Sequence, residues 1–599
     1  MEKYYFSRIR RGIALLLCLT MLLPLFAVPV GATEDADSAE ETSLGGFQNI
    51  GLDILSDQGG LADTLAGVAP TAYSSNAISI PSYTGGKTSQ ALAYDCGNGV
   101  SKDGAKSYLK IVTGTNSSQF VSYKSKLVNA GYKLVSEKEV PSKYATDPNR
   151  FASYLSADGT HKLYTYHLPY YGEARIIVDT QADTVGGYSY TPQAGVSVEP
   201  KLVMWGLSTS YTGYHMDTSV SGGNVGMENN GVLLIIRMRD NSLFFYDGGI
   251  MAQMSDAESA ELLAYCRELT GTPAGKKMVI NTWFVSHAHD DHFEAFGRFI
   301  NINHKHFDLK NVVYNIDLER GSVTDLGGGG TSPASKDLRK ALDVITTHYP
   351  DVKYYKPHTG ETFNVAGITF DVLYTHEDRL VPTSSGSLSF ETDTLSSSKI
   401  DIVDIGGTYR DGLYKNADTQ QSDFNDTSTV LRVNFENGVD GIFYADLNLA
   451  KSILMSVYPQ SALKTDIMMV PHHLFDAHTD LAKYADARVY LCPQSKAAVY
   501  GADNDYTTPN ATDKSCRDKL RNNFAAMKDG LSAMGRTEGV HYDIFWGGSE
   551  TVNIDINALG RELGYTPASR VATSGSYYTA EQSNNFAYTG WAMSTSAAG

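Results

Sequence analysis

His287-Ala288-His289-Asp290-Asp291-His292 is the segment that decides the fold of this chain. It places three imidazoles and two carboxylates within six residues, directly after an apolar run over residues 278–285. The run predicts a β-strand, and a strand that ends in such a cluster can aim several nitrogen and oxygen donors at one point. Because imidazole and carboxylate together suit zinc or a similar divalent ion, the sequence predicts a metal-dependent hydrolase.

The spacing within this segment divides its donors between two positions. His287 and His289 are two residues apart in extended chain, so both rings point to the same side. Asp291 and His292 follow the turn, at the start of a predicted helix over residues 293–300, and can face a second ion. Two ions roughly 3.5–4 Å apart can hold a bridging hydroxide and clamp an in-line displacement.

The first 32 residues have the pattern of an export signal. A basic start precedes an apolar run over residues 13–30, and Val30-Gly31-Ala32 offers small residues for cleavage. A membrane anchor is the alternative, because the run is nearly long enough to span a bilayer, but Pro24 and Pro29 favour cleavage. We therefore expect a secreted protein with no stable membrane span after cleavage; association with the cell wall stays open.

The charge of the chain limits its partners. It carries 49 Lys and Arg against 67 Asp and Glu, a net charge of −18. Removal of residues 1–32 takes away four basic side chains and one acidic one, so the net charge falls to −21. This disfavours a broad basic surface for long nucleic acid, although a local basic groove stays open. The four remaining cysteines are scattered without a Cys-x-x-Cys pair, so no disulfide framework is expected.

Two folded domains are predicted. Residues 85–182 combine one amphipathic helix with several strands and predict a small α+β domain. Residues 201–562 alternate strands and helices and form the predicted hydrolase domain. The other segments are a low-complexity lead-in over 33–84, a linker over 183–200 and a polar tail over 563–599. His161 and His167 are expected on the surface of strands, and a surface position is also expected for the loop histidines His358, His376 and His478.

The motif at residues 287–292 resembles the signature of the metallo-β-lactamase fold superfamily, and further segments follow in the order that this superfamily shows. Upstream, residues 243–249 resemble the strand and Asp-Gly element that precedes the metal motif. Downstream, residues 425–433 and 441–446 are similar to a strand pair whose last aspartate bridges two ions. Residues 466–473 resemble the strand that delivers the final histidine. The resemblance implies an α/β fold, a four-layer αββα sandwich, preceded here by the small α+β domain.

The most similar sub-pattern is that of the metallohydrolase domain attached to bacterial DNA-uptake (competence) channels, and of its secreted relatives. These carry an Asn-x-x-Ser-x-Val-Leu strand, a Gly-Asp bridging element and a Pro-His-His-Gly-Ser end. This chain has Ala445 in place of the glycine, which is a mild change. It has His473-Leu474-Phe475 in place of His-Gly-Ser, which leaves a phosphate-contacting role of that turn open.

One histidine of the wider superfamily is missing. True β-lactamases and lactonases carry a further histidine before the bridging aspartate, whereas residues 400–446 contain none. Asn425, Asp426 or a water is expected at the matching place. The first metal position is then weaker and more open, and either one or two ions are bound.

The resemblance implies a role for each residue of the site. The metal ligands would be His287, His289, Asp291, His292, Asp446 and His472. Asp446 would join the ions, and Asp291 would orient the nucleophile or bind the second ion. His472 is predicted as the ligand and His473 as the acid for the leaving group. Asp247 would hold a ligating imidazole by its other nitrogen.

The predicted reaction is hydrolysis by metal-bound hydroxide, with Zn²⁺ as one or two ions and Mn²⁺ as the alternative metal. A phosphodiester or phosphoester is the first choice of substrate, either a small molecule or a cell-surface group such as choline phosphate on wall polymers. The alternatives are a hydrolase of a lactone, cyclic amide or thioester, and a secreted metal-stabilised binding protein without turnover. The oligomeric state and the role of the small domain are not predicted.

Overall fold

A computed structural model of the chain describes residues 74–75, 78–88, 92–95, 106–207, 231–249, 254–316, 333–382, 388–390, 424–448, 450–476, 478–494, 496–500, 511–548, 550–565 and 577–582. By their contacts, residues 1–46 and residues 47–599 form two units, and every described residue belongs to the second. The predicted export signal lies outside the described residues. None of the helices within the described ranges is long and apolar enough to cross a membrane.

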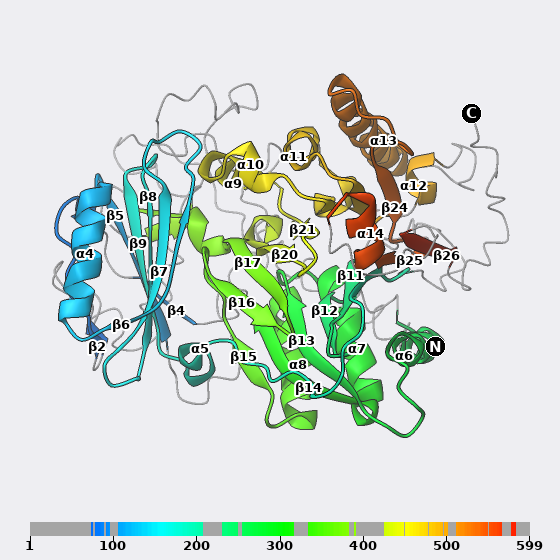
Figure 1. Ribbon diagram of the computed structural model, residues 1–599, viewed down its shortest axis with the longest axis horizontal. Helices are drawn as coiled ribbons and strands as arrows, with labels where there is room; N and C mark the ends of the chain where they lie inside the picture. Colours follow the sequence, from blue (N-terminus) through cyan, green and yellow to red (C-terminus); the bar gives the residue numbers. More distant parts are fainter. Residues whose placement is uncertain are drawn as a thin grey trace, which may run out of the picture. The chain divides into compact units, whose positions relative to one another are not determined.

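A small antiparallel sheet with one helix on its face forms the first part of the described chain (Figure 1). Its strand order is β3-β5-β9-β8-β7-β6, and β4 also pairs with β5. The helix α4 (Ser117–Asn129) begins at Asn116, whose side chain forms a capping box with Gln119, and it packs Phe120 and Leu127 against the sheet. The strands are β3 (Lys87–Thr88), β4 (Leu92–Asp95), β5 (Lys106–Thr113), β6 (Lys133–Val140), β7 (Asn149–Leu155), β8 (Lys162–Leu168) and β9 (Glu173–Asp179).

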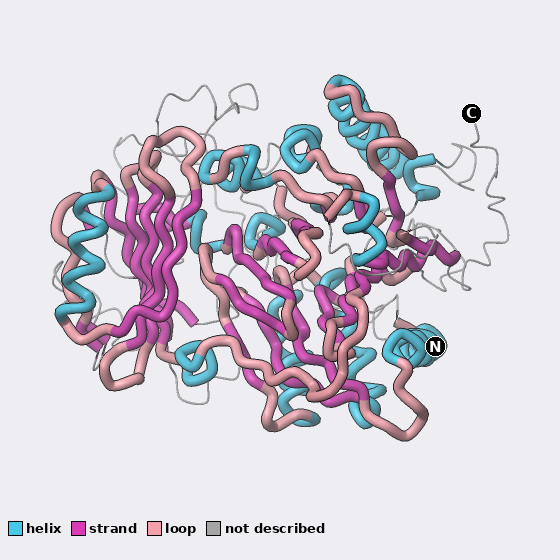
Figure 2. Tube along the Cα trace, viewed as in Figure 1, coloured by secondary structure: helices cyan, strands magenta, loops and turns pink. Residues whose placement is uncertain are grey.

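Two mixed sheets follow and form the two large sheets of the sandwich, both visible as magenta strands in Figure 2. The order in the eight-stranded sheet is β15-β14-β13-β12-β11-β10-β25-β26. Its strands are β10 (Lys201–Met204), β11 (Leu233–Arg237), β12 (Leu243–Asp247), β13 (Met278–Val285), β14 (Phe307–Tyr314), β15 (Lys353–Tyr355), β25 (Glu550–Asp555) and β26 (Tyr578–Gln582). The order in the seven-stranded sheet is β16-β17-β20-β21-β22-β23-β24. Its strands are β16 (Thr362–Val365), β17 (Ile368–Tyr374), β20 (Val430–Asn434), β21 (Asp440–Phe443), β22 (Ile467–Met469), β23 (Val489–Cys492) and β24 (Asp543–Trp546).

The two large sheets pack face to face, and helices cover their outer faces. Phe244 of β12 stacks on Phe370 of β17 with ring centroids 4.4 Å apart, within a core shared by both sheets. The neighbouring Phe245 points to the other face, where it meets Phe296 of α7 (Glu294–Asn303). On the far sheet, the Tyr490 hydroxyl donates to the Ala482 carbonyl of α11 (Thr479–Ala485). This alternation confirms the predicted αββα sandwich.

The remaining α-helices lie between the strands in the sequence. They are α5 (Ala182–Gly186), α6 (Asp256–Thr270), α8 (Pro333–His348), α9 (Lys451–Val457), α10 (Gln460–Leu463), α12 (Lys496–Tyr500), α13 (Ala511–Ala533) and α14 (Ile556–Glu562). The helix predicted over residues 293–300 corresponds to α7.

Charged side chains are buried where the small domain meets the sandwich. His358 has no exposed surface, and its two ring nitrogens face carboxylates from both sides. Its Nδ1 lies 2.9 Å from Glu377 Oε2, and its Nε2 lies 3.4 Å from Asp179 Oδ2 at the end of β9. Burial lowers the pKa of His358, but these two carboxylates outweigh burial and raise it to about 9. The imidazolium therefore links β9 of the antiparallel sheet to the sandwich.

A second buried contact lies beside this one. The Tyr166 hydroxyl of β8 donates to Asp378 Oδ1 at 2.6 Å, and Arg175 of β9 donates to the Asp378 carbonyl at 3.3 Å. Lys162 adds an ion pair of 3.4 Å with Glu361. Burying polar groups costs free energy unless each one is paired. The polar groups of the small sheet and of the sandwich therefore complement one another where the two parts meet.

The prediction that the outlying histidines lie on the surface was wrong for five of them. His161, His167, His358, His376 and His478 are all buried. His161 forms a 2.7 Å hydrogen bond with the Tyr132 hydroxyl, and His167 stacks on Phe120. For His161, His358 and His376 a polar partner from another element accompanies the buried imidazole, and sequence periodicity does not reveal such a partner.

Candidate metal centre

The predicted donors lie at the ends of strands from both large sheets. β12 and β13 run parallel in one sheet, and β21 and β22 run parallel in the other. Asp247 is the last residue of β12, and the segment from His287 to His292 follows β13. Asp446 follows β21, and His473 follows β22. Because parallel strands end at the same edge of a sheet, the two facing sheets bring these residues to one place.

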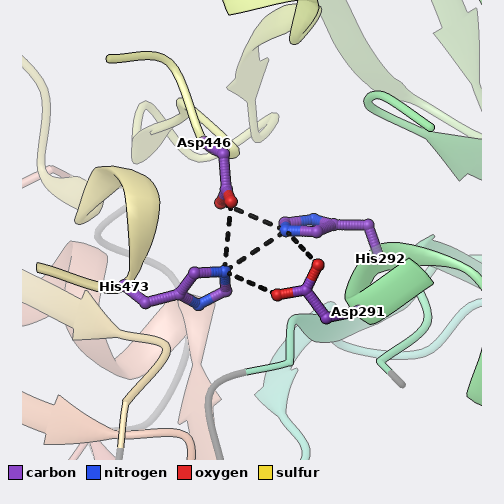
Figure 3. Close-up of side chains that lie close together, drawn as sticks. All are labelled: Asp291, His292, Asp446 and His473. Carbon is purple, nitrogen blue, oxygen red and sulfur yellow. Dashed lines mark hydrogen bonds and ion pairs between the residues drawn. The ribbon is translucent and has the colours of Figure 1, made fainter. Parts of the chain in front are cut away.

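Four of these side chains form a compact group (Figure 3): Asp291, His292, Asp446 and His473. His292 Nε2 lies 3.1 Å from Asp446 Oδ1, and His473 Nε2 lies 3.2 Å from Asp446 Oδ2. His473 Nε2 is also 3.2 Å from Asp291 Oδ2. One donor atom from each of the four lies within 4.8 Å of all the others, which is close enough to hold one metal ion.

The outer nitrogen of each imidazole in this group is held by a hydrogen bond. His292 Nδ1 lies 2.8 Å from Asp247 Oδ2, and His473 Nδ1 lies 2.8 Å from the Pro493 carbonyl oxygen. Since both outer nitrogens donate, both Nε2 atoms turn their lone pairs inward. Two lone pairs and two carboxylates that face one point require a positive charge between them. Asp247 thus makes the contact predicted for it.

A second set of donors shares Asp446 with the first: His287, His289 and Asp446. The His287 ring is fully buried, its Nδ1 lies 3.1 Å from Ser286 Oγ, and its Nε2 lies 3.9 Å from Asp446 Oδ2. That Nε2 has no hydrogen-bond partner among the described residues. A buried imidazole nitrogen without a partner is costly, and a metal ion would satisfy it. The donors of this chain therefore fit two ions that share one carboxylate.

The titratable groups of the centre shift one another's pKa values in different directions. Burial raises the pKa of the Asp446 carboxyl, but His292 and His473 outweigh burial and hold that pKa well below its usual range. Burial lowers the pKa of His473, but Asp446 and Asp291 raise it to about 9. Burial and the neighbouring imidazoles of His292 and His289 hold the pKa of His287 well below its usual range. The group of Asp291, His292, Asp446 and His473 thus stabilises positive charge, whereas His287 is held neutral.

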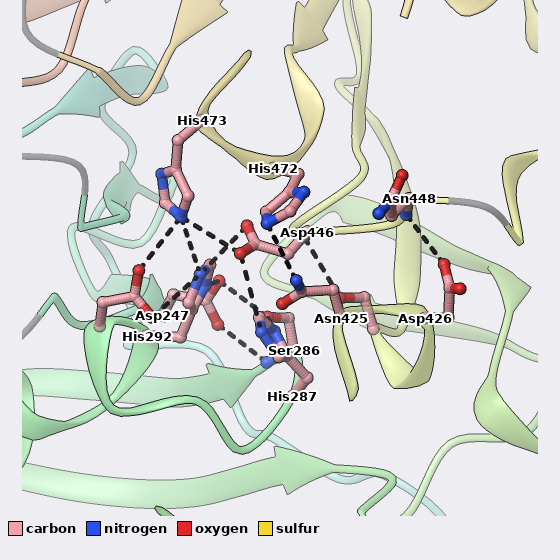
Figure 4. A network of polar contacts seen from close by, with 12 residues as sticks. Asp247, Ser286, His287, His292, Asn425, Asp426, Asp446, Asn448, His472 and His473 are labelled. Atoms are coloured by element: carbon pink, nitrogen blue, oxygen red, sulfur yellow. Dashed lines mark hydrogen bonds and ion pairs between the residues drawn. The ribbon is translucent and has the colours of Figure 1, made fainter. Parts of the chain in front are cut away.

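The two adjacent histidines are placed the other way round from the prediction. The prediction assigned the ligand position to His472, but His473 lies in the group. His472 turns to Asn425 (Figure 4), and its other ring nitrogen contacts Asp476. Both His473 nitrogens are then engaged, one by the Pro493 carbonyl and one by the cluster, so neither is left to protonate a leaving group as predicted.

Backbone conformation explains why His473, and not His472, points into the metal centre. His472, His473 and Leu474 have φ values of 45°, 48° and 64°, which are left-handed and uncommon for residues other than glycine. Three such residues in succession turn the two imidazoles in different directions and store strain at the site. Residues 472–474 include no glycine, so the sequence gives no indication of a left-handed turn at this point.

Of the six predicted ligands, the structure brings five together, and only His472 lies outside both donor sets. Two contacts of the site were not predicted. The Pro493 carbonyl leaves no signal in the sequence, because it is a backbone group supplied by a different strand end. Asp476 stands four residues after His472, a spacing that could have suggested the pair.

Comparison with known proteins does not assign the chain to a family. No protein-family model matches the chain, and no curated protein matches it. Among solved structures, it is similar to a metallo-β-lactamase with an HARLDQ motif from Cronobacter sakazakii, at 14% identity over 52% of this chain and 91% of that chain, with a TM-score of 0.24.

Two other similar structures carry different names. The metallo-β-lactamase fold protein YhfI from Bacillus subtilis is 10% identical over 54% of this chain and 93% of that chain, with a TM-score of 0.24. Human tRNase Z, short form, is 12% identical over 48% of this chain and 91% of that chain, with a TM-score of 0.23. Likeness at this level carries no argument about fold or activity, so both must be argued from the structure itself.

Proposed function

We propose that the protein is a secreted metal-dependent hydrolase that cleaves a phosphodiester or phosphoester bond. The observation that carries the proposal is the sharing of Asp446 between the two donor sets. A single carboxylate between two sets of imidazoles is the arrangement that two-ion hydrolysis requires. The predicted export signal supports secretion, and the relationship to the DNA-uptake metallohydrolase domain stays a prediction.

Divalent ions at these donors would lower the pKa of a water molecule and polarise a phosphoryl oxygen. The chain's own residues would orient the reactants. Asp291 is the most exposed of the four clustered side chains, at 10% against 3% or less for the others, so it is the candidate to orient the attacking water. Asp247 and the Pro493 carbonyl would hold the rings of His292 and His473 in a fixed orientation during the reaction.

Charge supports a phosphoester over a lactone or cyclic amide. Divalent ions held at these donors would attract a group that is already anionic beside the bond to be cleaved. A phosphoester carries such a charge, whereas a lactone does not. The net charge of −18 favours a small or surface-attached phosphoester over long nucleic acid.

The test is a parallel assay of the purified protein with added zinc or manganese. The substrates are bis-p-nitrophenyl phosphate, a chromogenic cephalosporin and a lactone. We expect turnover of the first that disappears in Asp446→Ala and persists in His541→Ala, a matched control at an exposed histidine. Activity confined to the cephalosporin or the lactone would overturn the substrate class. Bound metal with no turnover of any of the three would favour the binding protein instead.

A further inference from the structure

The two donor sets of the metal centre are unequal. One contains Asp291, His292, Asp446 and His473, while the other contains only His287, His289 and Asp446. The first metal position, defined by His287 and His289, therefore has one protein donor fewer. A neutral oxygen from a neighbouring element would give both positions the same number of protein donors. The 3-10 helix η8 (Phe424–Thr427) contains a side chain with such an oxygen.

The segment that follows η8 runs directly past the first metal position. The Thr429 backbone N–H donates to the Ser286 carbonyl at 3.0 Å, one residue before His287. The hydroxyl of Ser428 accepts the backbone N–H of Asp446 at 3.2 Å. The chain thus lies between the start of the histidine motif and the shared aspartate, and it brings Asn425 and Asp426 beside them.

Asp426 is used elsewhere. Its Oδ1 accepts the backbone N–H groups of Asn448 at 3.0 Å and Ala450 at 2.9 Å, and it thereby fixes the loop that leads into α9. Figure 4 shows Asp426 and Asn448 together, on the side of Asn425 away from His287. The carboxylate that the sequence offered as an alternative is therefore a loop anchor.

Asn425 is oriented by a relay of two hydrogen bonds. Its Nδ2 donates to His472 Nε2 at 2.9 Å, and His472 Nδ1 contacts the Asp476 carboxylate. Because a carboxylate only accepts, His472 donates from Nδ1 and its Nε2 must accept. The nitrogen of the Asn425 amide therefore faces His472, and its oxygen faces the opposite way. In Figure 4 the amide group points toward His287 and Asp446.

We propose that the Asn425 amide oxygen is a protein ligand of the first metal position, held in orientation by His472 and Asp476. The inference rests on the proposed two-ion centre, but its test reads metal binding and not hydrolysis. It also gives His472 a function that explains why two histidines stand side by side: His473 binds the metal, and His472 positions a ligand.

The experiment titrates the metal-free full chain with cobalt(II), follows the visible absorption of the bound ion, and measures each dissociation constant by competition with a chelator. His473→Ala serves as the background in which the first position is observed alone. We expect Asn425→Ala to weaken that position by roughly ten- to a hundredfold and to alter the cobalt spectrum. Asn425→His, which offers an imidazole instead, should restore or strengthen binding.

The matched control is Asn448→Ala, which removes a neighbouring amide placed on the side of Asn425 away from His287. It should leave the cobalt spectrum and both dissociation constants unchanged. An Asn425→Ala protein with the same first-position affinity and spectrum as the background protein would overturn the proposal. This outcome is independent of the substrate, so a protein that hydrolyses none of the test compounds can still confirm the ligand.

Discussion

The Nε2 atoms of His292 and His473 lie 3.3 Å apart, although 181 positions separate the two residues in the sequence. The Nδ1 atom of each ring forms a hydrogen bond, His292 with Asp247 and His473 with the Pro493 carbonyl. Two electron pairs directed at one another are repulsive unless a proton or a metal ion lies between them. This pair of residues from different sheets therefore defines the second metal position more sharply than the local motif does.

Replacement of His473 and of His472 should have different consequences. His473→Ala removes a direct donor of the second metal position, so we expect that position to lose roughly a hundredfold or more in affinity. His472→Ala leaves all donors of that position in place. Metal content by mass spectrometry and zinc titration of both variants provide the measurement. Loss of the second ion in His472→Ala, with full retention in His473→Ala, would contradict the assignment.

Asp247→Asn should weaken metal binding without removing a ligand. The carboxylate accepts from His292, from the Ser286 backbone N–H and from the Ser286 hydroxyl, so an amide cannot reproduce all three contacts. We expect a loss of about ten- to a hundredfold in metal affinity. Asp308→Asn, at a half-exposed side chain distant from these contacts, is the control and should bind metal normally. Equal affinities of the two variants would exclude the positioning role of Asp247.

Docking of the small domain should weaken at alkaline pH. The pKa of His358 is raised to about 9 in the folded protein, against an ordinary value of 6.5. A raised pKa contributes stability that is fully present below the unfolded value and is lost as pH rises through the folded value. We therefore expect the free energy of unfolding to fall between about pH 6.5 and pH 9. The measurement is urea unfolding at several pH values.

Other groups also titrate in this range, so the informative quantity is the difference between the wild type and His358→Gln. That difference should shrink as pH rises, because both proteins then carry a neutral side chain at this position. A difference that stays constant across the range would show that His358 is not protonated in the folded state.

Removal of one buried hydroxyl at the domain boundary should destabilise the protein measurably. Tyr166→Phe takes the donor away from Asp378 Oδ1, which is then left buried without that partner. The expected cost is about 1–3 kcal/mol in the free energy of unfolding. Tyr500→Phe is the matched control, because Tyr500 is 53% exposed and its hydroxyl can bond to water. Equal stability of the two variants would mean that the Tyr166 contact contributes nothing to docking.

The family resemblance of its motifs implied the sandwich, and local patterns in the sequence were enough to predict most donors of the metal centre. Residues 278–285 and the four donors that follow them are adjacent in the chain, so their geometry depends on one strand and one turn. Asp446 was identified because an apolar strand that ends in a carboxylate implies a partner for that charge. Such inferences need no knowledge of how distant segments meet.

Only the tertiary structure decided between His472 and His473, gave Asp426 and Asn425 different contacts, and buried His358 between two domains. In each case the outcome depends on a left-handed turn or on a partner far away in the chain. Two adjacent residues of the same type have the same local propensities, so the sequence cannot decide which of the two histidines binds the metal. The direction in which each side chain points is set by the packing of one sheet edge against the other.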